Sequence, residues 1–344
     1  MNELTNMLSE LCAFPSVSGR ERASREGIIA LASPYFDEIR EDSFGNLLLI
    51  KKSARENAPK LMLDAHFDEV GMMVSELHEG GFLSVCAIGG LDTRVLSATE
   101  VTIYGKREIY GVVSSVPPHI IGRGSASAPK MNELYIDTGY DLDTLKEIVS
   151  VGDVVEFKAG LITLENNRVV SKSLDDKACV CALITTAMLC EANKLTFDLY
   201  VTLSAQEETG KNGARLVAYE IEPDIAIITD VNFARDEGVE ETDSIEIGKG
   251  AGIDISSFTN IPLTRKIMQI LDRAKIPYQK ICEPSRTSTN NDGVSICGKG
   301  VRTALMSIPL SSMHTPSEVV CLDDIISMSR ILLEIAYTPI EELL

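Results

Sequence analysis

"DLYVTLSAQEETG" (198–210) joins a short apolar run to two adjacent carboxylates, Glu207 and Glu208. The run has the length and the β-branched content of a buried strand, and a helix is expected to begin just after it. Two neighbouring carboxylates repel each other, and each loses hydration if the site is enclosed. A positive partner is therefore expected beside them.

Helices and strands alternate on both sides of this stretch, which is typical of an α/β fold. Between residues 72 and 169 the pattern changes to short strands with glycine and proline between them, and a short helix fits only near 141–149. We therefore predict a discontinuous α/β domain, residues 1–71 and 170–344, interrupted by a small all-β domain, residues 72–169. Helices are expected at 3–13, 174–193, 210–220, 263–275 and 322–338, and strands at 60–71, 197–205, 224–230, 301–308 and twice within 36–52.

The composition excludes several classes of function. With a formal charge of −19 over 344 residues, the chain is not expected to bind nucleic acid or an anionic membrane. Its most apolar helical stretch, 179–190, is too short to cross a bilayer, and the N-terminus lacks the features of a signal peptide, so a cytoplasmic location is predicted. The eight cysteines are scattered, which favours reduced thiols over disulfides or thiolate metal ligands.

Five polar clusters lie at predicted strand ends or helix starts, where parallel strands of an α/β sheet place their sites. Each cluster alone has a simpler explanation, such as a capping aspartate or a surface histidine. Taken together the simple explanations weaken, because all five would have to fall at the same edge of the sheet by chance. The clusters are "HFDEVG" (66–71), "SLDDKA" (173–178), "QEETG" (206–210), "ITDVN" (228–232) and "SMHTPSE" (312–318).

Histidine and carboxylate ligands in combination suit zinc, cobalt or manganese. The number of ligands indicates two ions, each with one histidine and one carboxylate of its own, and a further carboxylate shared between them. One of Glu207 and Glu208 would then bind metal while the other faces a metal-bound water as a base. The charge of the ions would offset the repulsion between these two side chains.

These clusters, in this order, resemble the metallo-aminopeptidases of the tetrahedral and glutamyl-aminopeptidase type, the forty-second metallopeptidase family. Some members of that family were once described as endoglucanases ("cellulase M"). The resemblance covers nearly the whole chain and implies a three-layer zinc-exopeptidase fold, phosphorylase/hydrolase-like, with an inserted small β-barrel-like domain. It also includes "VSGRE" (17–21), "DSFGNL" (42–47), "GVVSSVPPH" (111–119), "ELYIDTG" (133–139) and "VGDVVEF" (151–157).

By position, the resemblance implies a role for each residue of the site. It implies that Glu207 is the general base and that Asp68 orients the first histidine. It further implies that the peptide bond between Asp175 and Asp176 is cis, as in related dinuclear peptidases. The first metal would be held by His66, Asp175 and Asp230, and the second by Asp175, Glu208 and His314, with Asp175 bridging.

The sequence departs from the family pattern at one point and matches it loosely at another. The family usually has an Arg-Tyr pair shortly before its last metal-binding histidine, whereas this chain has Ser311 and Ser312 there. The stretch "TSTNNDG" (287–293) resembles the family's Gly-Thr-Asp stretch only loosely, with Asp292 as the match. The chemistry of the substrate pocket is therefore expected to differ.

The predicted function is a metal-dependent aminopeptidase that removes N-terminal residues from short peptides by attack of a metal-bridging water, with zinc or cobalt as the first choice of ion and manganese as an alternative. A deacylase acting on another small amide is an alternative outcome of the same site. A glycoside hydrolase (endoglucanase) is a weaker alternative, because that chemistry needs no histidine or metal and the chain has no tryptophan. The resemblance also implies a homo-oligomer, with the inserted domain in dimer contacts and in control of substrate access, and dimers assembling into a tetrahedral dodecamer.

Overall fold

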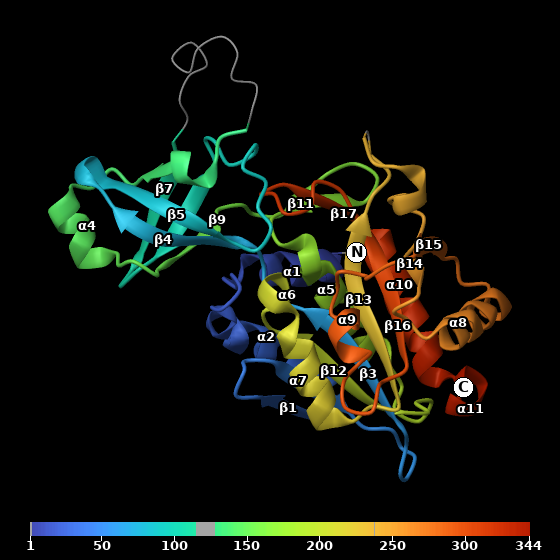
Figure 1. The fold of residues 1–344 in the computed structure, drawn as a ribbon. Coiled ribbons are helices and arrows are strands. Elements are labelled where there is room, and N and C mark those ends of the chain that lie inside the picture. The colour runs from blue at the N-terminus through green and yellow to red at the C-terminus, as the bar shows by residue number, and fades with distance from the viewer. Residues whose placement is uncertain (1, 115–127, 237) are drawn as a thin grey trace.

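The computed structural model describes residues 2–114, 128–236 and 238–344. Its chain forms an α/β part and a smaller closed β-barrel beside it (Figure 1). The predicted α/β fold with an inserted barrel-like domain is confirmed. The exact division at 71/72 and 169/170 stays a prediction. The end of the "GVVSSVPPH" motif, beyond Ser114, lies outside the described residues.

The α/β part is built on an eight-stranded sheet with the order β1-β2-β12-β3-β13-β16-β14-β15. Four central strands, β12, β3, β13 and β16, are parallel, whereas β14 runs antiparallel to β16 and β2 antiparallel to β12. Strands buried on both faces consist of continuous apolar runs, as these central ones do. The strands are β1 (Glu38–Glu41), β2 (Leu47–Lys51), β3 (Lys60–His66), β12 (Asp198–Ser204), β13 (Ile225–Phe233), β14 (Gly252–Ser256), β15 (Gln279–Glu283) and β16 (Thr303–Leu310).

The register of the parallel strands brings their polar ends together. Ser204, the last residue of β12, lies opposite His66, the last residue of β3. Asp230 of β13 lies opposite Ser307 of β16. Because parallel strands end at the same edge of a sheet, the chain segments that follow β3, β12 and β13 meet there.

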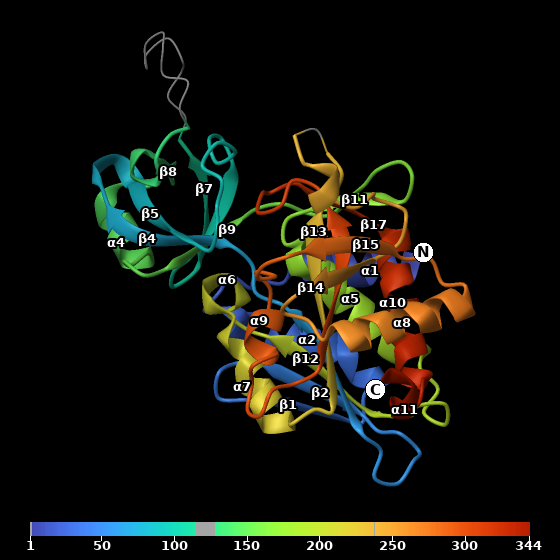
Figure 2. The same ribbon diagram turned by 45° about the vertical axis from the view of Figure 1, so that its right-hand side comes forward.

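Helices cover both faces of the sheet and complete three layers (Figure 1 and Figure 2). Side chains alternate along β3, so that Leu61 and Leu63 belong to the larger core while Met62 belongs to the smaller one on the other face. The larger core includes α1 (Asn2–Ala13), α2 (Arg25–Ala32), α5 (Leu174–Leu189), α8 (Ile261–Ala274), α10 (Leu322–Tyr337) and α11 (Ile340–Leu343). The smaller core includes α7 (Asn212–Ile221) and α9 (Asn291–Val294), and α6 (Glu207–Gly210) precedes α7.

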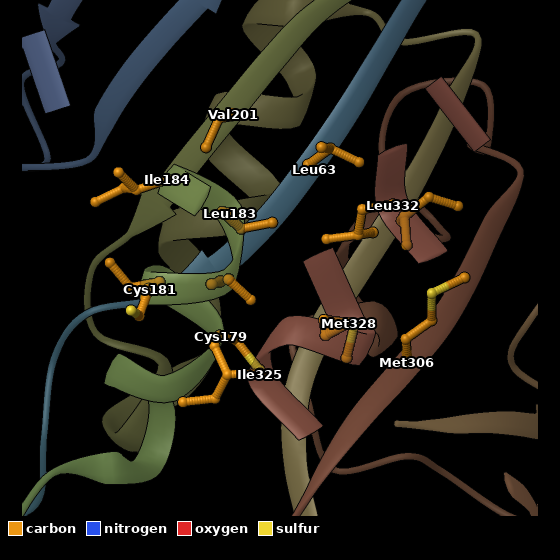
Figure 3. Close-up of a cluster of buried hydrophobic side chains, with 14 of the residues drawn as sticks. Leu63, Cys179, Cys181, Leu183, Ile184, Val201, Met306, Ile325, Met328 and Leu332 are labelled. Atoms are coloured by element: carbon orange, nitrogen blue, oxygen red, sulfur yellow. The ribbon is translucent and has the colours of Figure 1, made fainter. Parts of the chain in front are cut away.

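Helix α5 lies in the middle of the larger core, where it packs on strands β3 and β13 and beside α1 and α10 (Figure 3). Every residue from 174 to 187 is buried, which explains why the helix is apolar on all sides and not only on one stripe. Cys179 and Cys181 point into this core as free thiols, as predicted from the scattered cysteines. The buried helix therefore supports its own first turn, which contains Asp175, rigidly.

The barrel has its own hydrophobic core and the strand order β4-β5-β8-β7-β6-β9. A three-stranded sheet, β10-β11-β17, lies in the α/β part where the chain returns from the barrel. The barrel elements are β4 (Gly71–Leu77), β5 (Phe82–Ile88), β6 (Glu100–Tyr104), β7 (Glu108–Val113), β8 (Tyr135–Asp137), α4 (Leu142–Ile148) and β9 (Val154–Phe157). The small sheet consists of β10 (Ile162–Thr163), β11 (Arg168–Ser171) and β17 (Glu318–Cys321), and short 3₁₀ turns occur at Glu21–Ala23, Ser33–Tyr35, Glu79–Gly81, Met131–Glu133 and Glu241–Asp243.

The structure corrects two predicted elements and adds two strands. The strand expected at 60–71 ends at His66, and a separate strand begins at Gly71. Between them Glu69 forms an isolated bridge with Val17, and the Phe67 amide donates to the Ser204 carbonyl. The helix expected at 210–220 starts only at Asn212, since Lys211 adopts a left-handed conformation with φ 57°. Strands β14 and β15 were not predicted. Among the described ranges, no helix combines the length and the apolar character that a bilayer crossing requires.

Candidate metal centre

The carboxyl ends of β3, β12 and β13 open into a cleft with a volume of about 700 Å³. Residues 282–289, from the end of β15 into the segment after it, and residues 231–233 at the end of β13 form part of its wall. Gly90, in the segment that follows β5 of the barrel, closes it from the other side. The predicted metal ligands and the predicted base all line this cleft: His66, Asp175, Glu207, Glu208, Asp230 and His314.

The first group of candidate ligands consists of His66, Asp175 and Asp230, with one ligand atom of each within 4.8 Å of the others. His66 Nε2 lies 3.0 Å from Asp175 Oδ1 and 3.8 Å from Asp230 Oδ1. All three side chains are buried. The other ring nitrogen of His66, Nδ1, lies 3.1 Å from the backbone oxygen of Asp68 and 3.5 Å from its Oδ1.

The second group consists of Asp175, Glu208 and His314, within the same 4.8 Å limit. His314 Nε2 lies 3.3 Å from Asp175 Oδ2 and 3.5 Å from Glu208 Oε1. Asp175 thus directs one carboxylate oxygen toward each group. His314 Nδ1 lies 2.7 Å from the carbonyl oxygen of Gly90, so this nitrogen carries a hydrogen and donates it.

The backbone around Asp175 is unusual and aims the side chain into the cleft. Ser173 has a left-handed conformation with φ 53°, and the Asp175–Asp176 peptide bond is cis, as the family resemblance implies. Asp175 and Asp176 do not have helical dihedral angles although they belong to the first turn of α5. The position of the Asp175 carboxylate is therefore set by a specific local conformation and not by regular helix geometry.

Two buried carboxylates hold the backbone of the candidate ligands in place. Asp68 accepts the amide of Glu207 at 2.9 Å and the amide of Glu208 at 3.2 Å. In the same way Glu318, on β17, accepts the amide of Asp175 at 3.1 Å and the amide of His314 at 2.8 Å. Each carboxylate uses one oxygen for each amide, which fixes the distance between two site residues.

The charges in the cleft are unbalanced. Burial raises the pKa of Glu208 and of Asp230 well above their usual ranges, and the negative charge of Asp175 adds to this effect. Burial also acts to raise the pKa of Asp175, but its contacts with His314 and His66 outweigh burial and hold that pKa below its usual range. Burial lowers the pKa of His66, yet hydrogen bonds with carboxylates raise it well above its ordinary value. Buried carboxylates therefore outnumber the cationic groups that face them.

Glu207 lies beside both groups but belongs to neither. Its Oε1 is buried and has no hydrogen-bond partner among the described residues, and Lys211 Nζ lies 3.6 Å away. Burial raises the pKa of Glu207, with His66 and Lys211 opposing the effect. The side chain is thus a carboxylate with a free oxygen at the edge of the candidate centre.

The residue types fit divalent metal ions. Each group offers one imidazole nitrogen and carboxylate oxygens, which are the ligands that zinc, cobalt and manganese accept. The histidine nitrogens that face away from the groups, Nδ1 of His66 and of His314, are both held by backbone oxygens. This arrangement of outer contacts is typical of metal-binding histidines.

The sequence prediction missed Glu318 and Gly90. Glu318 was part of the "SMHTPSE" cluster, but no pattern in the sequence shows that its side chain turns back toward two backbone amides. Gly90 lies in another domain, and its only signal is the glycine pair "GG" at 89–90.

The two departures from the family pattern fall outside both groups. Ser311 and Ser312 do not line the cleft, although Met313 and His314 next to them do. Asp292 accepts hydrogen bonds from the amide and the hydroxyl of Thr287, at 3.1 and 2.9 Å, and belongs to neither group. The predicted change in pocket chemistry at Ser311 and Ser312 stays a prediction.

Comparison with known proteins agrees with this geometry. Residues 45–331 match the family model of the M42 glutamyl aminopeptidases. The chain is 30% identical to a lysyl aminopeptidase of Pyrococcus furiosus over 95% of this chain and 96% of that protein.

Solved structures are similar over nearly the full length. An aminopeptidase from the archaeon Desulfurococcus kamchatkensis has a TM-score of 0.92 at 28% identity, and the match covers 99% of this chain and 97% of that one. The TET1 peptidase of Pyrococcus horikoshii, described as assembling into a tetrahedron or a large octahedral shell, has a TM-score of 0.85 at 25% identity, covering 97% of this chain and 99% of that one. With a matching family model, a full-length relative and this cleft, the chain belongs to the M42 glutamyl aminopeptidase family and is a metal-dependent aminopeptidase.

Proposed function

We propose that the enzyme binds two divalent ions in the cleft and uses them to release N-terminal residues from short peptides. The observation that supports this most directly is the shared carboxylate of Asp175, which directs one oxygen to each ligand group. The first ion would be held by His66, Asp175 and Asp230, and the second by Asp175, Glu208 and His314. Zinc or cobalt suits this ligand set first, with manganese as an alternative.

The ions would supply Lewis-acid polarisation of the scissile carbonyl and a lowered pKa for the attacking water. Glu207 would accept the proton of that water and deliver it to the leaving amine. Its buried Oε1, without a hydrogen-bond partner in the described chain, is in a suitable place for this role. Burial raises its pKa, which makes the carboxylate a better proton acceptor near neutral pH.

Asp68 would orient residues of the site without binding an ion itself. Its carboxylate accepts the amides of Glu207 and Glu208, and both its backbone oxygen and its Oδ1 face His66 Nδ1. One residue thus orients the proposed base, a ligand of the second ion and a ligand of the first. We expect Asp68 to be a positioning residue that does not touch substrate.

The test of the base is Glu207→Gln. We expect this variant to bind two metal ions like the wild type, because Glu207 lies outside both groups, and to lose turnover by about 10²- to 10⁴-fold. Metal content is measured by elemental analysis, and turnover on an aminoacyl chromogenic amide. The control is Glu220→Gln, an exposed glutamate on α7 whose ion pair with Arg40 is 3.4 Å long, which should leave turnover unchanged. Full turnover in Glu207→Gln would remove Glu207 from the role of base.

The competing activities are separated by substrate. The metal-loaded enzyme is given three substrates, with and without a chelator. They are a peptide with a free N-terminus, the same peptide with an acetylated N-terminus, and cellulose. We expect hydrolysis of the free peptide only, and none after chelation. Cleavage of the acetyl group would favour the deacylase alternative, and activity on cellulose would favour the glycosidase alternative.

The same proposal includes a homo-oligomer, built through the barrel as a dimer and extending to a tetrahedral dodecamer. A structurally similar peptidase assembles into a tetrahedron, and the barrel exposes large apolar side chains at Tyr110, Val112, Tyr135 and Val151. Sedimentation of the wild type and of Val151→Asp tests whether the surface around Val151 belongs to an interface. The predicted cytoplasmic location and the restriction of substrates by such an assembly stay predictions.

A further inference from the structure

The segment that follows β5 of the barrel reaches across to the second ligand group. The carbonyl oxygen of Gly90 accepts a hydrogen bond from His314 Nδ1 at 2.7 Å. This contact leaves Nε2 of His314 as the ring nitrogen that faces Asp175 and Glu208. A backbone atom of the inserted barrel therefore selects the tautomer and the orientation of a candidate metal ligand in the other part of the molecule.

The loop approaches the second group closely at both glycines. A Cβ atom added at Gly90 would lie 3.2 Å from His314 Nδ1, and one added at Gly89 would lie 3.4 Å from Glu208 Oε2 and 2.8 Å from Cγ1 of Val70. Gly89 also has φ +76°, which side chains rarely tolerate. Two ligands of the same group, Glu208 and His314, are thus packed against one loop of the barrel.

A buried ion cluster fixes the barrel in this position. Lys172, just before α5, lies 2.8 Å from Glu69 Oε2 and 2.5 Å from Glu156 Oε1, and all three side chains are almost fully buried. Glu69 is in the segment that leads from β3 to the barrel, Lys172 lies between β11 and α5 in the α/β part, and Glu156 is on strand β9 of the barrel. Strand β9 pairs with β4, and β4 pairs with β5, whose last residue immediately precedes Gly89. The cluster is therefore connected to the glycine pair through two strand pairings.

The first ligand group has no such dependence. His66 is the last residue of β3 and Asp230 lies within β13, both in the central sheet. Among the described contacts, the outer nitrogen of His66 is held by Asp68, which belongs to the α/β part. Displacement of the barrel would leave these contacts intact.

We propose that the barrel positions His314, so that its docking through Lys172 and Glu156 sets the affinity of the second metal group and not that of the first. This inference rests on the proposed two-ion centre. It assigns the barrel a role in completing the metal site of its own subunit, in addition to any role in assembly. Gly90 and Glu156 are then positioning residues, because both would act on the second group through His314.

The test uses two variants that act at different distances. Gly90→Ala places a methyl group against His314, and Glu156→Gln removes the ion pair between the barrel and Lys172 while Glu69 keeps its pairing with that lysine. The control is Gly160→Ala, in the segment returning from the barrel, where an added Cβ would meet nothing within 4 Å and φ is not in the left-handed range. Circular dichroism and thermal melting establish that each full-length variant is folded.

The readouts are the number and affinity of bound Co²⁺ ions by calorimetric titration, and the visible absorption spectrum of the bound cobalt. We expect the first ion to bind as in the wild type and the second to bind about 10- to 100-fold more weakly in both variants, as is usual when the outer partner of a metal-binding histidine is disturbed. The control should bind both ions like the wild type.

The possible outcomes distinguish failure of the two-ion centre from failure of the role proposed for the barrel. A wild type that binds fewer than two ions overturns the proposed two-ion centre, and with it this inference. A wild type with two ions, together with folded variants that keep the second ion or weaken both ions equally, overturns only the inference. A weakened second ion in Glu156→Gln, where no atom has been added near His314, supports it most directly.

Discussion

Single carboxylates organise this site by accepting pairs of backbone amides. Asp68 holds Glu207 and Glu208, and Glu318 holds Asp175 and His314. A hydrogen bond to a charged acceptor contributes about 1.5–3 kcal/mol, and a buried charge left without its partners is costly. These two residues therefore determine whether the ligands converge.

The role of Glu318 can be tested by Glu318→Gln. An amide has one acceptor oxygen, so one of the two backbone N–H groups loses its partner and faces an NH₂ group. We expect binding of the proposed second ion, for which Asp175 and His314 are candidate ligands, to be lost or weakened at least tenfold, as measured by metal titration. The matched control is Asp324→Asn, because Asp324 is buried, accepts the amides of Gly248 and Gly250 at 2.7 Å each, and lies outside the cleft wall. Equal effects of the two variants on metal affinity would show that Glu318 is only a structural residue.

Asp254, another buried carboxyl group, makes the free energy of unfolding depend on pH. Burial raises the pKa of Asp254 to about 7; Ser307 and Asn232 oppose this as hydrogen-bond donors, while Glu283 adds to it. Because the folded pKa is above the unfolded value, the folded state loses stability as pH rises from about 4 to about 7, and the loss is then constant. The full effect is on the order of 4 kcal/mol.

Asp254→Asn should remove this dependence, since an amide does not ionise and can still bond to Ser307. We expect the free energy of unfolding of the variant to increase relative to the wild type between pH 4.5 and pH 7.5. Urea unfolding of the metal-free proteins at several pH values measures the difference. Parallel curves for the two proteins would contradict the assignment.

The sequence singled out His66, Asp175, Glu208, Asp230 and His314 as candidate ligands, and the structure brings them into two adjacent groups. Their role as ligands stays a prediction. The sequence could single out these residues because each lies in a polar cluster beside an apolar run, and the carboxyl ends of parallel strands converge at one edge of the sheet. Glu318 and Gly90 could not be found in this way. Their roles depend on where one side chain and one carbonyl point after folding, and neither direction follows from residue type or spacing.

At the scale of elements, helix α5 holds one side of the site in place. Strands β3 and β13 and helices α1 and α10 pack around this helix, so its residues 174–187 are all buried (Figure 3). The first turn of α5 holds Asp175, and the remainder fixes that turn against β3 and β13. Loss of packing in α5 should therefore affect stability more than it affects the chemistry of the cleft.

Leu183→Ala tests this expectation. Leu183 is fully buried in α5, and such truncations cost about 2–5 kcal/mol through lost burial and the cavity left behind. The control is Leu189→Ala at the exposed end of the same helix, where the side chain is 47% exposed and the change should be about 0.5 kcal/mol or less. Chemical unfolding measures both, and folded Leu183→Ala should still bind metal. A Leu183→Ala variant as stable as the wild type would contradict the expectation that packing of α5 contributes to stability.

Elements with a strong apolar period were predictable, whereas short or irregular ones were not. Helices α1, α5, α8 and α10 lie within a few residues of their predicted ranges. Strands β14 and β15 have only five residues each, and polar or charged residues interrupt their apolar pattern, so the sequence gives them little signal. The break between α6 and α7 depends on the left-handed conformation of Lys211, which is rare for lysine and has no local sequence mark.

At the scale of the whole molecule, metal ions and stability are linked. Ions that bind only the folded state stabilise it, by about 2.7 kcal/mol for each site when the free metal concentration is 100 times its Kd. We therefore expect a chelator to lower the melting temperature by several degrees, and added zinc or cobalt to restore it. Differential scanning calorimetry measures the change.

Asp175→Asn provides the control for this linkage. The shared carboxylate belongs to both groups, so the variant should bind metal poorly and show little response of its melting temperature to the chelator. A wild type with the same melting temperature in chelator and in metal would contradict the linkage.

The eight-stranded sheet ends at both sides on short strands that carry charge. Strand β1 exposes Glu38 and Arg40, and β15 exposes Lys280. Open strand edges are where β-proteins aggregate, and charged residues on short edge strands oppose the addition of a strand from another molecule. These two edges therefore disfavour growth of the large sheet into fibres in a crowded solution of the chain.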